Sequence, residues 1–283
     1  THKDLEIIVV DDGSRDRTWA VIQEQSDLHP AVRGVRFSRN FGKEAGIYAG
    51  LQQAAGEYIS LIDADLQQRP EVVLEMMKIL DEKPETDCVC AYQEKRKESR
   101  LMSFTKSMFY KVINKISEVD FVNGASDFRL MNRTMVDTIL SMTEYHRFSK
   151  GIFGWIGFNT EYIPYEVAKR EHGETKWSPV KLFRYAMGGI IAFSTAPLKF
   201  VTFIGFLSAF LSVAYMIFVI IQKLCFGIDV PGYATIIVLL LVMGGLILFC
   251  LGIIGEYLAK MYVQLKSRPI YVEREHIENK KDK

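Results

Sequence analysis

Hydrophobic residues recur in two alternating patterns over the first part of the chain. Four short apolar runs have the length of buried strands: residues 5–10, 32–37, 58–62 and 87–92. The segments between them show helical patterns that begin near Asp16, Ala45 and Pro70. Because strands and helices alternate, the sequence predicts an α/β domain with a mostly parallel sheet and helices on both faces.

The later part of the chain is far more apolar. No charged residue occurs from Phe200 to Ile221 or from Ala234 to Gly255, and each stretch exceeds the roughly 20 residues that cross a bilayer as a helix. A core helix of a soluble protein rarely runs so long without a polar face, so both stretches are predicted to span a membrane. Before them, Pro179 opens a helix whose polar side carries Lys181 and Arg184, a pattern typical of a helix that lies in the membrane interface.

Basic residues gather on one side of the two predicted spans. The segment that links the spans has only Lys223, whereas many lysines and arginines precede the first span and follow the second. The positive-inside rule therefore places the α/β domain and both termini in the cytoplasm. We expect four units: an α/β domain at 1–178, an interfacial helix at 179–199, a two-helix transmembrane domain at 200–259, and a charged tail at 260–283. From Glu273 onward the tail is predicted to be disordered.

Composition excludes several function classes. The chain has 35 Lys and Arg against 34 Asp and Glu, a net charge of +1, so no global field favours nucleic acid. Cys88 and Cys90 lie in an apolar strand pattern without a neighbouring histidine, which favours core residues over zinc ligands. The four scattered cysteines imply no disulfide framework.

Two carboxylates stand at the end of the third predicted strand. Asp63 and Asp65 follow the run 58–62 and precede the helix opened by Pro70. Open α/β sheets bind their ligands at the carboxyl ends of strands. Alternate residues of an extended segment lie on one side, so both carboxylates can hold Mg²⁺ or Mn²⁺ against a substrate diphosphate. An isolated Asp-x-Asp is more often a solvated acidic turn that caps a helix.

Two further charged groups accompany this pair. Asp127 and Arg129 alternate with apolar residues, which places both on one face of an extended segment. They either form a structural ion pair or face a polar cavity. The loop 168–178 brings Arg170 and Lys176 together with a glycine directly before the membrane part. Such a loop suits a phosphate clamp or an anchor for anionic lipid head groups.

Taken together, these motifs resemble the family 2 glycosyltransferases. The residues that carry the likeness are Asp11-Asp12-Gly13-Ser14, Asp63-Ala64-Asp65-Leu66-Gln67 with Pro70-Glu71, Asp127-Phe128-Arg129-Leu130, and Arg170-Glu171-His172-Gly173-Glu174-Thr175-Lys176. With the two spans, the chain is similar to the polyprenyl-phosphate glycosyltransferases: dolichol-phosphate mannose synthases and the bacterial two-span enzymes that glucosylate undecaprenyl phosphate. The likeness runs from about Leu5 through the second span. Four motifs in the right order, together with the two spans, are specific for this family. It implies a GT-A (Rossmann-like) fold in a multi-pass protein of the plasma (inner) membrane.

The resemblance also implies an activity and a set of residues. The activity is inverting transfer of a hexose, from UDP-glucose by preference, to undecaprenyl or another polyprenyl phosphate, with Mg²⁺ or Mn²⁺. The implied roles are nucleotide-sugar binding for Asp12, Asn40, Lys43 and Asp63; metal binding for Asp63, Asp65 and Gln67; and the transfer chemistry for Asp65, Asp127, Arg129, Arg170 and Lys176. Within the last group, Arg170 and Lys176 would grip the acceptor phosphate.

Several alternatives stay open. Family members begin with a strand and a turn of the Val-Pro-x-Tyr-Asn-Glu type, which this sequence does not contain, so we expect the first strand to be missing. One alternative is therefore a truncated, non-catalytic membrane-anchored binding protein. Another is a glycan synthase with a different acceptor, although the Gln-x-x-Arg-Trp motif of processive synthases is absent from the sequence. Gly244, Gly245 and Gly252 would permit close helix contact in a homo-oligomer.

Overall fold

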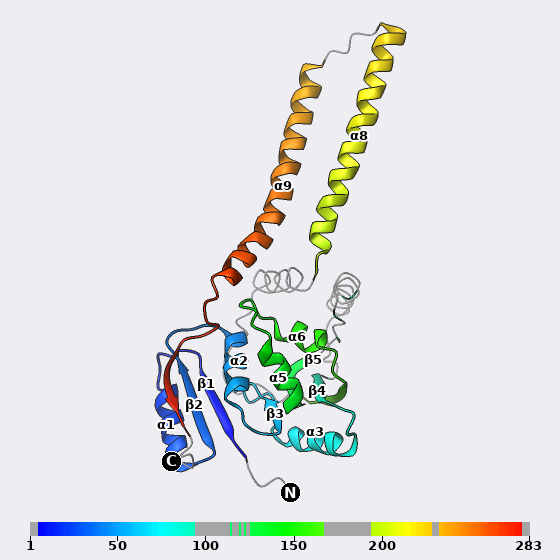
Figure 1. The fold of residues 1–283 in the computed structure, drawn as a ribbon. Coiled ribbons are helices and arrows are strands. Elements are labelled where there is room, and N and C mark those ends of the chain that lie inside the picture. Colours follow the sequence, from blue (N-terminus) through cyan, green and yellow to red (C-terminus); the bar gives the residue numbers. More distant parts are fainter. Residues whose placement is uncertain are drawn as a thin grey trace.

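The computed structural model describes residues 5–93, 125–166, 194–227 and 232–278, together with Asn114, Val119 and Val122. The α/β part runs in the order β1 (Ile7–Asp11), α1 (Thr18–Leu28), β2 (Val32–Phe37), α2 (Lys43–Gln53), β3 (Tyr58–Leu61), α3 (Glu71–Glu82), β4 (Cys88–Gln93), β5 (Ala125–Asn132), α5 (Arg133–Ser141), α6 (Ser149–Trp155) and β6 (Thr160–Tyr165). The helices α8 (Ala196–Phe226) and α9 (Tyr233–Leu265) and the strand β7 (Glu273–Ile277) follow. The four predicted strands and three predicted helices of the first part are confirmed (Figure 1).

The strands form two mixed sheets. β1 and β2 pair in parallel and β7 adds antiparallel to β2, in the order β1-β2-β7. The second sheet has the order β3-β5-β4-β6, in which β5 is antiparallel to both neighbours and β4 is parallel to β6. The α/β class is confirmed, but the prediction of a mostly parallel sheet is wrong. The reason is that β5, which carries the Asp127 segment, enters between β3 and β4 instead of lying outside the sheet.

The prediction of a disordered tail is also wrong for residues 273–277. They pair with β2, from Phe37 opposite Glu273 to Gly34 opposite Ile277. The Glu275 carboxylate accepts hydrogen bonds from Trp19 Nε1 at 2.8 Å and from Arg36 Nη1 at 2.8 Å. Charge density alone indicates a solvated segment, and the partners that order this one lie far away in the sequence. The segment after α9 is therefore part of the α/β domain (Figure 1).

Two hydrophobic cores cover the two faces of the four-stranded sheet. On one face, Cys88 and Met131 pack with residues of α2, α5 and α6. On the other face, Phe128 packs with residues of α3. Successive strand residues point to opposite faces, so Asp127 and Arg129 lie on the side of α2, α5 and α6. This alternation places two charged groups at the border of an apolar core.

The helices α8 and α9 rise away from the α/β part (Figure 1). Residues 196–225 and 235–265 are long and apolar enough to cross a membrane, and the most apolar part of each is unburied within the described chain. The near end of α9 is joined to the α/β domain by Gln264, whose side chain accepts from Tyr145 N at 2.8 Å and donates to Thr143 O at 3.2 Å. The interfacial helix expected at 179–199 falls largely outside the described residues, and α8 already begins at Ala196.

Candidate active site

Asp12 organises the loop of residues 38–43 that leads into α2. Its two carboxylate oxygens accept hydrogen bonds from Phe41 N at 2.6 Å and from Gly42 N at 2.9 Å. Gly42 precedes α2 with a φ of 96°, which L side chains rarely adopt, so glycine lets the loop turn sharply into the helix. By holding Phe41 and Gly42, Asp12 fixes the position of Lys43, the first residue of α2. Its assignment to the nucleotide stays a prediction.

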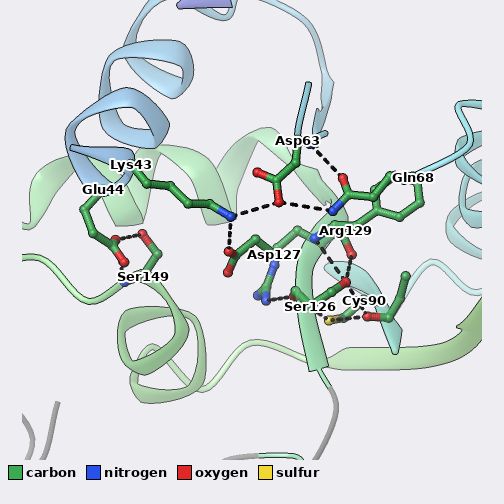
Figure 2. Close-up of polar contacts among 11 residues, drawn as sticks. Lys43, Glu44, Asp63, Gln68, Cys90, Ser126, Asp127, Arg129 and Ser149 are labelled. Carbon is green, nitrogen blue, oxygen red and sulfur yellow. Dashed lines mark hydrogen bonds and ion pairs between the residues drawn. The ribbon is translucent and has the colours of Figure 1, made fainter. Parts of the chain in front are cut away.

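The Lys43 ammonium lies between two carboxylates, one from the loop after β3 and one from β5 (Figure 2). Its Nζ is 2.9 Å from Asp63 Oδ2 and 2.7 Å from Asp127 Oδ2. The pairing of β3 with β5 explains the meeting, because Leu61 lies opposite Arg129 and the next residues bring Asp63 beside Asp127. The start of α2, the loop after β3 and the start of β5 thus meet at this cation.

Electrostatics keep this cluster charged. Burial alone would lower the pKa of Lys43, but the charge and hydrogen bond of Asp127, and then those of Asp63, raise it above its ordinary value. Burial alone would raise the pKa of Asp127, but the charge and hydrogen bond of Lys43 outweigh it, so the Asp127 pKa falls below its ordinary value. Lys150 and Arg129 act in the same direction on Asp127. Lys43 and Asp127 are therefore both ionised at neutral pH.

The loop after β3 holds the acidic pair through its own backbone. Asp63 N donates to Gln68 Oε1 at 2.7 Å, and Gln68 Nε2 donates to Asp63 Oδ2 at 3.4 Å. Asp65 Oδ1 accepts from Gln67 N at 3.1 Å, and Leu66 between them has a φ of 60°. The buried Gln68 is a positioning residue that the sequence did not reveal, because a glutamine after an acidic turn gives no distinctive pattern. The side-chain role of Gln67 stays a prediction.

Arg129 lies beside Asp127 but is held by other groups. Its Nη2 donates to Ser126 O at 2.9 Å, and its guanidinium carbon lies 3.6 Å from the centre of the Phe153 ring. The residue is only 5% exposed, and its Nε has no hydrogen-bond partner in the described part of the chain. The ion pair between Asp127 and Arg129 that the sequence left open is not formed. A buried guanidinium with an unused donor suits an anionic ligand.

Glu44 is a second positioning residue that sequence reasoning missed. Its carboxylate accepts hydrogen bonds from both the backbone nitrogen, at 2.8 Å, and the hydroxyl of Ser149, the first residue of α6 (Figure 2). Burial raises the Glu44 pKa above its ordinary value; the Ser149 hydrogen bonds oppose this, and the negative charge of Asp127 adds to it. Glu44 thereby fixes α6, which carries Phe153 against Arg129.

The acidic pair fits a hard divalent cation only in part. In the described ranges no group of three His, Cys, Asp or Glu side chains is placed to hold a metal. Asp63 is 39% exposed at its side chain, so it is open to a ligand. Two carboxylates can hold Mg²⁺ or Mn²⁺ when substrate phosphate oxygens and water complete the shell. The donors present are therefore compatible with a metal that arrives together with a diphosphate.

The remaining predicted residues are Asn40, Arg170 and Lys176. Asn40 is exposed in the 38–43 loop, and its backbone oxygen accepts from Arg39 Nη1 at 3.0 Å. Arg170 and Lys176 lie outside the described residues. Their phosphate-binding role stays a prediction.

Comparison with known proteins identifies the family of this chain. Residues 1–140 match the model for glycosyl transferase family 2, and residues 196–261 match the GtrB C-terminal hairpin. Over 280 residues the chain is 42% identical to the putative glycosyltransferase CsbB of Bacillus subtilis (strain 168), covering 99% of this chain and 84% of the relative. The chain belongs to glycosyltransferase family 2. The predicted family and the enzyme class are confirmed.

Other relatives of this glycosyltransferase also match nearly the whole chain. It is 38% identical over 281 residues to the bactoprenol glucosyl transferase of Shigella phage SfV, covering 99% of this chain and 90% of the relative. Among solved structures, the mannosyltransferase PcManGT from Pyrobaculum calidifontis in complex with GDP-Man and Mn²⁺ shares 16% identity, covers 91% of this chain and 75% of that one, and gives a TM-score of 0.38. The hairpin match covers α8 and most of α9, and it supports membrane association of the enzyme.

Proposed function

We propose that this glycosyltransferase moves a hexose from a nucleotide sugar to a polyprenyl phosphate at the cytoplasmic face of the plasma membrane. UDP-glucose is the proposed donor and undecaprenyl phosphate the proposed acceptor. The observation that carries the proposal is the convergence of Lys43, Asp63 and Asp127 beside the buried Arg129, in a domain joined to a membrane hairpin. Relatives named for bactoprenol glucosyl transfer support the choice of acceptor and sugar.

The donor would bind where strand β3 ends and strand β5 begins. Asp63 and Asp65, with Gln67 beside them, would hold Mg²⁺ or Mn²⁺, which supplies a Lewis acid for the charge that develops on the departing nucleoside diphosphate. Lys43 and Arg129 add fixed positive charge at the same place. A preorganised positive environment in a partly buried site stabilises such charge more than water does.

Asp127 is better suited to orienting the sugar than to removing a proton. Its lowered pKa makes it a weak base, and one of its oxygens is already engaged with Lys43. The acceptor needs little base, because a phosphate monoester is anionic at neutral pH. The main requirements are to align the two substrates in line, which gives inversion in one displacement, and to screen their repulsion. Arg170 and Lys176 would serve the acceptor side.

The membrane hairpin is consistent with a lipid acceptor. A polyprenyl phosphate keeps its tail in lipid and its phosphate at the interface, so the enzyme has to hold its site close to the bilayer. The contacts of Gln264 with Thr143 and Tyr145 tie the end of α9 to the α/β domain. With the positive-inside distribution of basic residues, this supports a multi-pass protein whose α/β domain and termini face the cytoplasm.

A transfer assay tests the proposal. The protein in lipid nanodiscs is incubated with undecaprenyl phosphate and a panel of labelled nucleotide sugars, and the lipid product is extracted and its anomeric configuration determined. We expect glucose transfer from UDP-glucose that ceases with EDTA and returns with Mg²⁺ or Mn²⁺. Asp65→Ala should abolish transfer, whereas Asp137→Ala, which changes an exposed carboxylate on α5, should leave it intact. Nucleotide binding without transfer to any lipid would favour the non-catalytic alternative.

A further inference from the structure

The segment that leaves the second membrane helix lies against the 38–43 loop. Tyr271 stacks on Phe37 with ring centroids 4.7 Å apart, and Phe37 meets Phe41 edge to face at 5.8 Å. The backbones are joined as well, since Ser38 N donates to Val272 O at 2.9 Å. Tyr271 and Phe41 belong to the same hydrophobic cluster, which is built around the buried Phe37. The loop that leads to Lys43 is therefore backed by residues that follow α9.

The same tyrosine also contacts the far end of the helix that the loop opens. Its hydroxyl donates to Gln52 Oε1 at 3.0 Å, in the last turn of α2. Phe41 is thus held on one side by its backbone bond to Asp12 and on the other by the Phe37–Tyr271 stack. Lys43 follows directly, so the place of its ammonium depends on both supports.

The segment itself is anchored at both ends. Before Tyr271, the side chain of Gln264 is bonded to the loop that contains Thr143 and Tyr145. After it, Glu275 is bonded to Trp19 and Arg36. A displacement of α9 relative to the α/β domain would therefore be transmitted to Tyr271, since only a short stretch separates it from the end of the helix.

We infer that Tyr271 is a positioning residue for the donor site, through which the end of the membrane hairpin holds the 38–43 loop and hence Lys43. The inference rests on the proposed function for the identity of the donor, but the positioning of the loop is a property of the protein alone. Removal of the ring would leave Phe37 and Phe41 without their outer support and would loosen the amides of Phe41 and Gly42 from Asp12.

Hydrogen exchange and kinetics on three full-length variants in nanodiscs test the inference. In Tyr271→Ala, the peptide that covers residues 38–43 should exchange about threefold to tenfold faster, the range expected from the loss of an aromatic pair. Peptides from β4 and β5 should be unchanged. Tyr271→Phe, which keeps the stack and loses only the hydroxyl, should behave nearly like the wild type. Val272→Ala is the matched control, because that residue contributes its backbone oxygen to the loop.

Kinetics then separate positioning from general damage. In Tyr271→Ala, a displaced loop should raise the KM for UDP-glucose about threefold to tenfold, the same range as for exchange. The KM for undecaprenyl phosphate should be unchanged. Simple loss of folded enzyme would instead lower the apparent kcat alone. The inference is overturned if exchange in the 38–43 peptide stays at the wild-type rate, or if β4 and β5 accelerate equally. A wild type that transfers no sugar would sink the proposed function, and the exchange result would still decide the role of Tyr271.

Discussion

Replacement of Lys43 by methionine removes the cation at the centre of the site while keeping the length of the side chain. The wild-type ammonium makes two short contacts, with Asp63 and Asp127, that methionine cannot make. Two carboxylates then face each other without a counter-charge in a partly buried place. The expected result is loss of stability as well as loss of transfer.

The size of the effect depends on how deeply each of the two ion pairs of Lys43 is buried. The Asp127 side chain is 17% exposed and the Asp63 side chain 39%. A charge-assisted hydrogen bond to a buried carboxylate contributes about 1.5–3 kcal/mol, and an exposed ion pair about 0–1 kcal/mol. Lys43→Met should therefore lower the free energy of unfolding by about 1.5–4 kcal/mol, which corresponds to a fall in Tm of about 3–16 °C.

The pH dependence has a definite sign. Because the folded-state pKa of Asp127 lies below its ordinary value of 3.8, its contribution is present above pH 3.8 and is lost as the pH falls through the folded pKa. The raised pKa of Lys43 keeps the ammonium charged until the pH exceeds its ordinary value of 10.5. The Tm difference between wild type and variant should therefore be constant from about pH 5 to pH 8 and should shrink under acid conditions.

Thermal unfolding in nanodiscs, followed by tryptophan fluorescence, measures this difference. Lys83→Met is the matched control, because Lys83 makes one exposed ion pair with Glu161 and its loss should hardly change Tm. The double variant Lys43→Met/Asp127→Asn should regain part of the stability, since the buried charge is then removed together with its partner. Equal Tm values for the two lysine variants, or no recovery in the double variant, would refute the electrostatic reasoning.

Two other substitutions probe the groups around the cluster. Arg129→Lys keeps the charge but loses the planar guanidinium over Phe153 and its hydrogen bond to Ser126 O. We therefore expect transfer to fall by about 10²-fold and Tm to fall as well; near-normal turnover would argue against an anion at Arg129. Glu44→Gln removes a carboxylate whose pKa burial raises above its ordinary 4.5. A raised carboxyl pKa stabilises the folded wild type at low pH, and this contribution is lost as the pH rises. The Tm of Glu44→Gln minus that of the wild type should therefore increase between about pH 4.5 and pH 7. Melting curves across that range measure this difference.

Local patterns were sufficient to predict most of the elements, because the hydrophobic pattern of consecutive residues indicates a strand such as β3 or a helix such as α3. Their pairing was harder to predict. The Asp127 segment was recognised as extended, but nothing in its sequence indicates that it pairs between β3 and β4. The strand β7 was missed because its charge resembles that of a solvated tail, and its ordering contacts, with Trp19 and Arg36, are made by residues far earlier in the chain.

The site shows the same limit. Asp63, Asp127 and Lys43 were each proposed from a separate motif, and their meeting at one point depends on the antiparallel register of β3 with β5. Gln68 and Glu44 could not be found in this way. Each is a polar residue near the start of a helix, where such residues are common for reasons unrelated to a site. Only the three-dimensional arrangement shows that they hold Asp63 and α6.

The return of the chain from the hairpin to β2 has a consequence for biogenesis. During synthesis, β2 emerges from the ribosome early, whereas the strand that pairs with its outer edge emerges only after α8 and α9 have been made. That edge of the sheet stays open in the meantime and is able to join wrong partners. Closure of the first sheet is therefore a late step, which follows the synthesis of both long apolar helices.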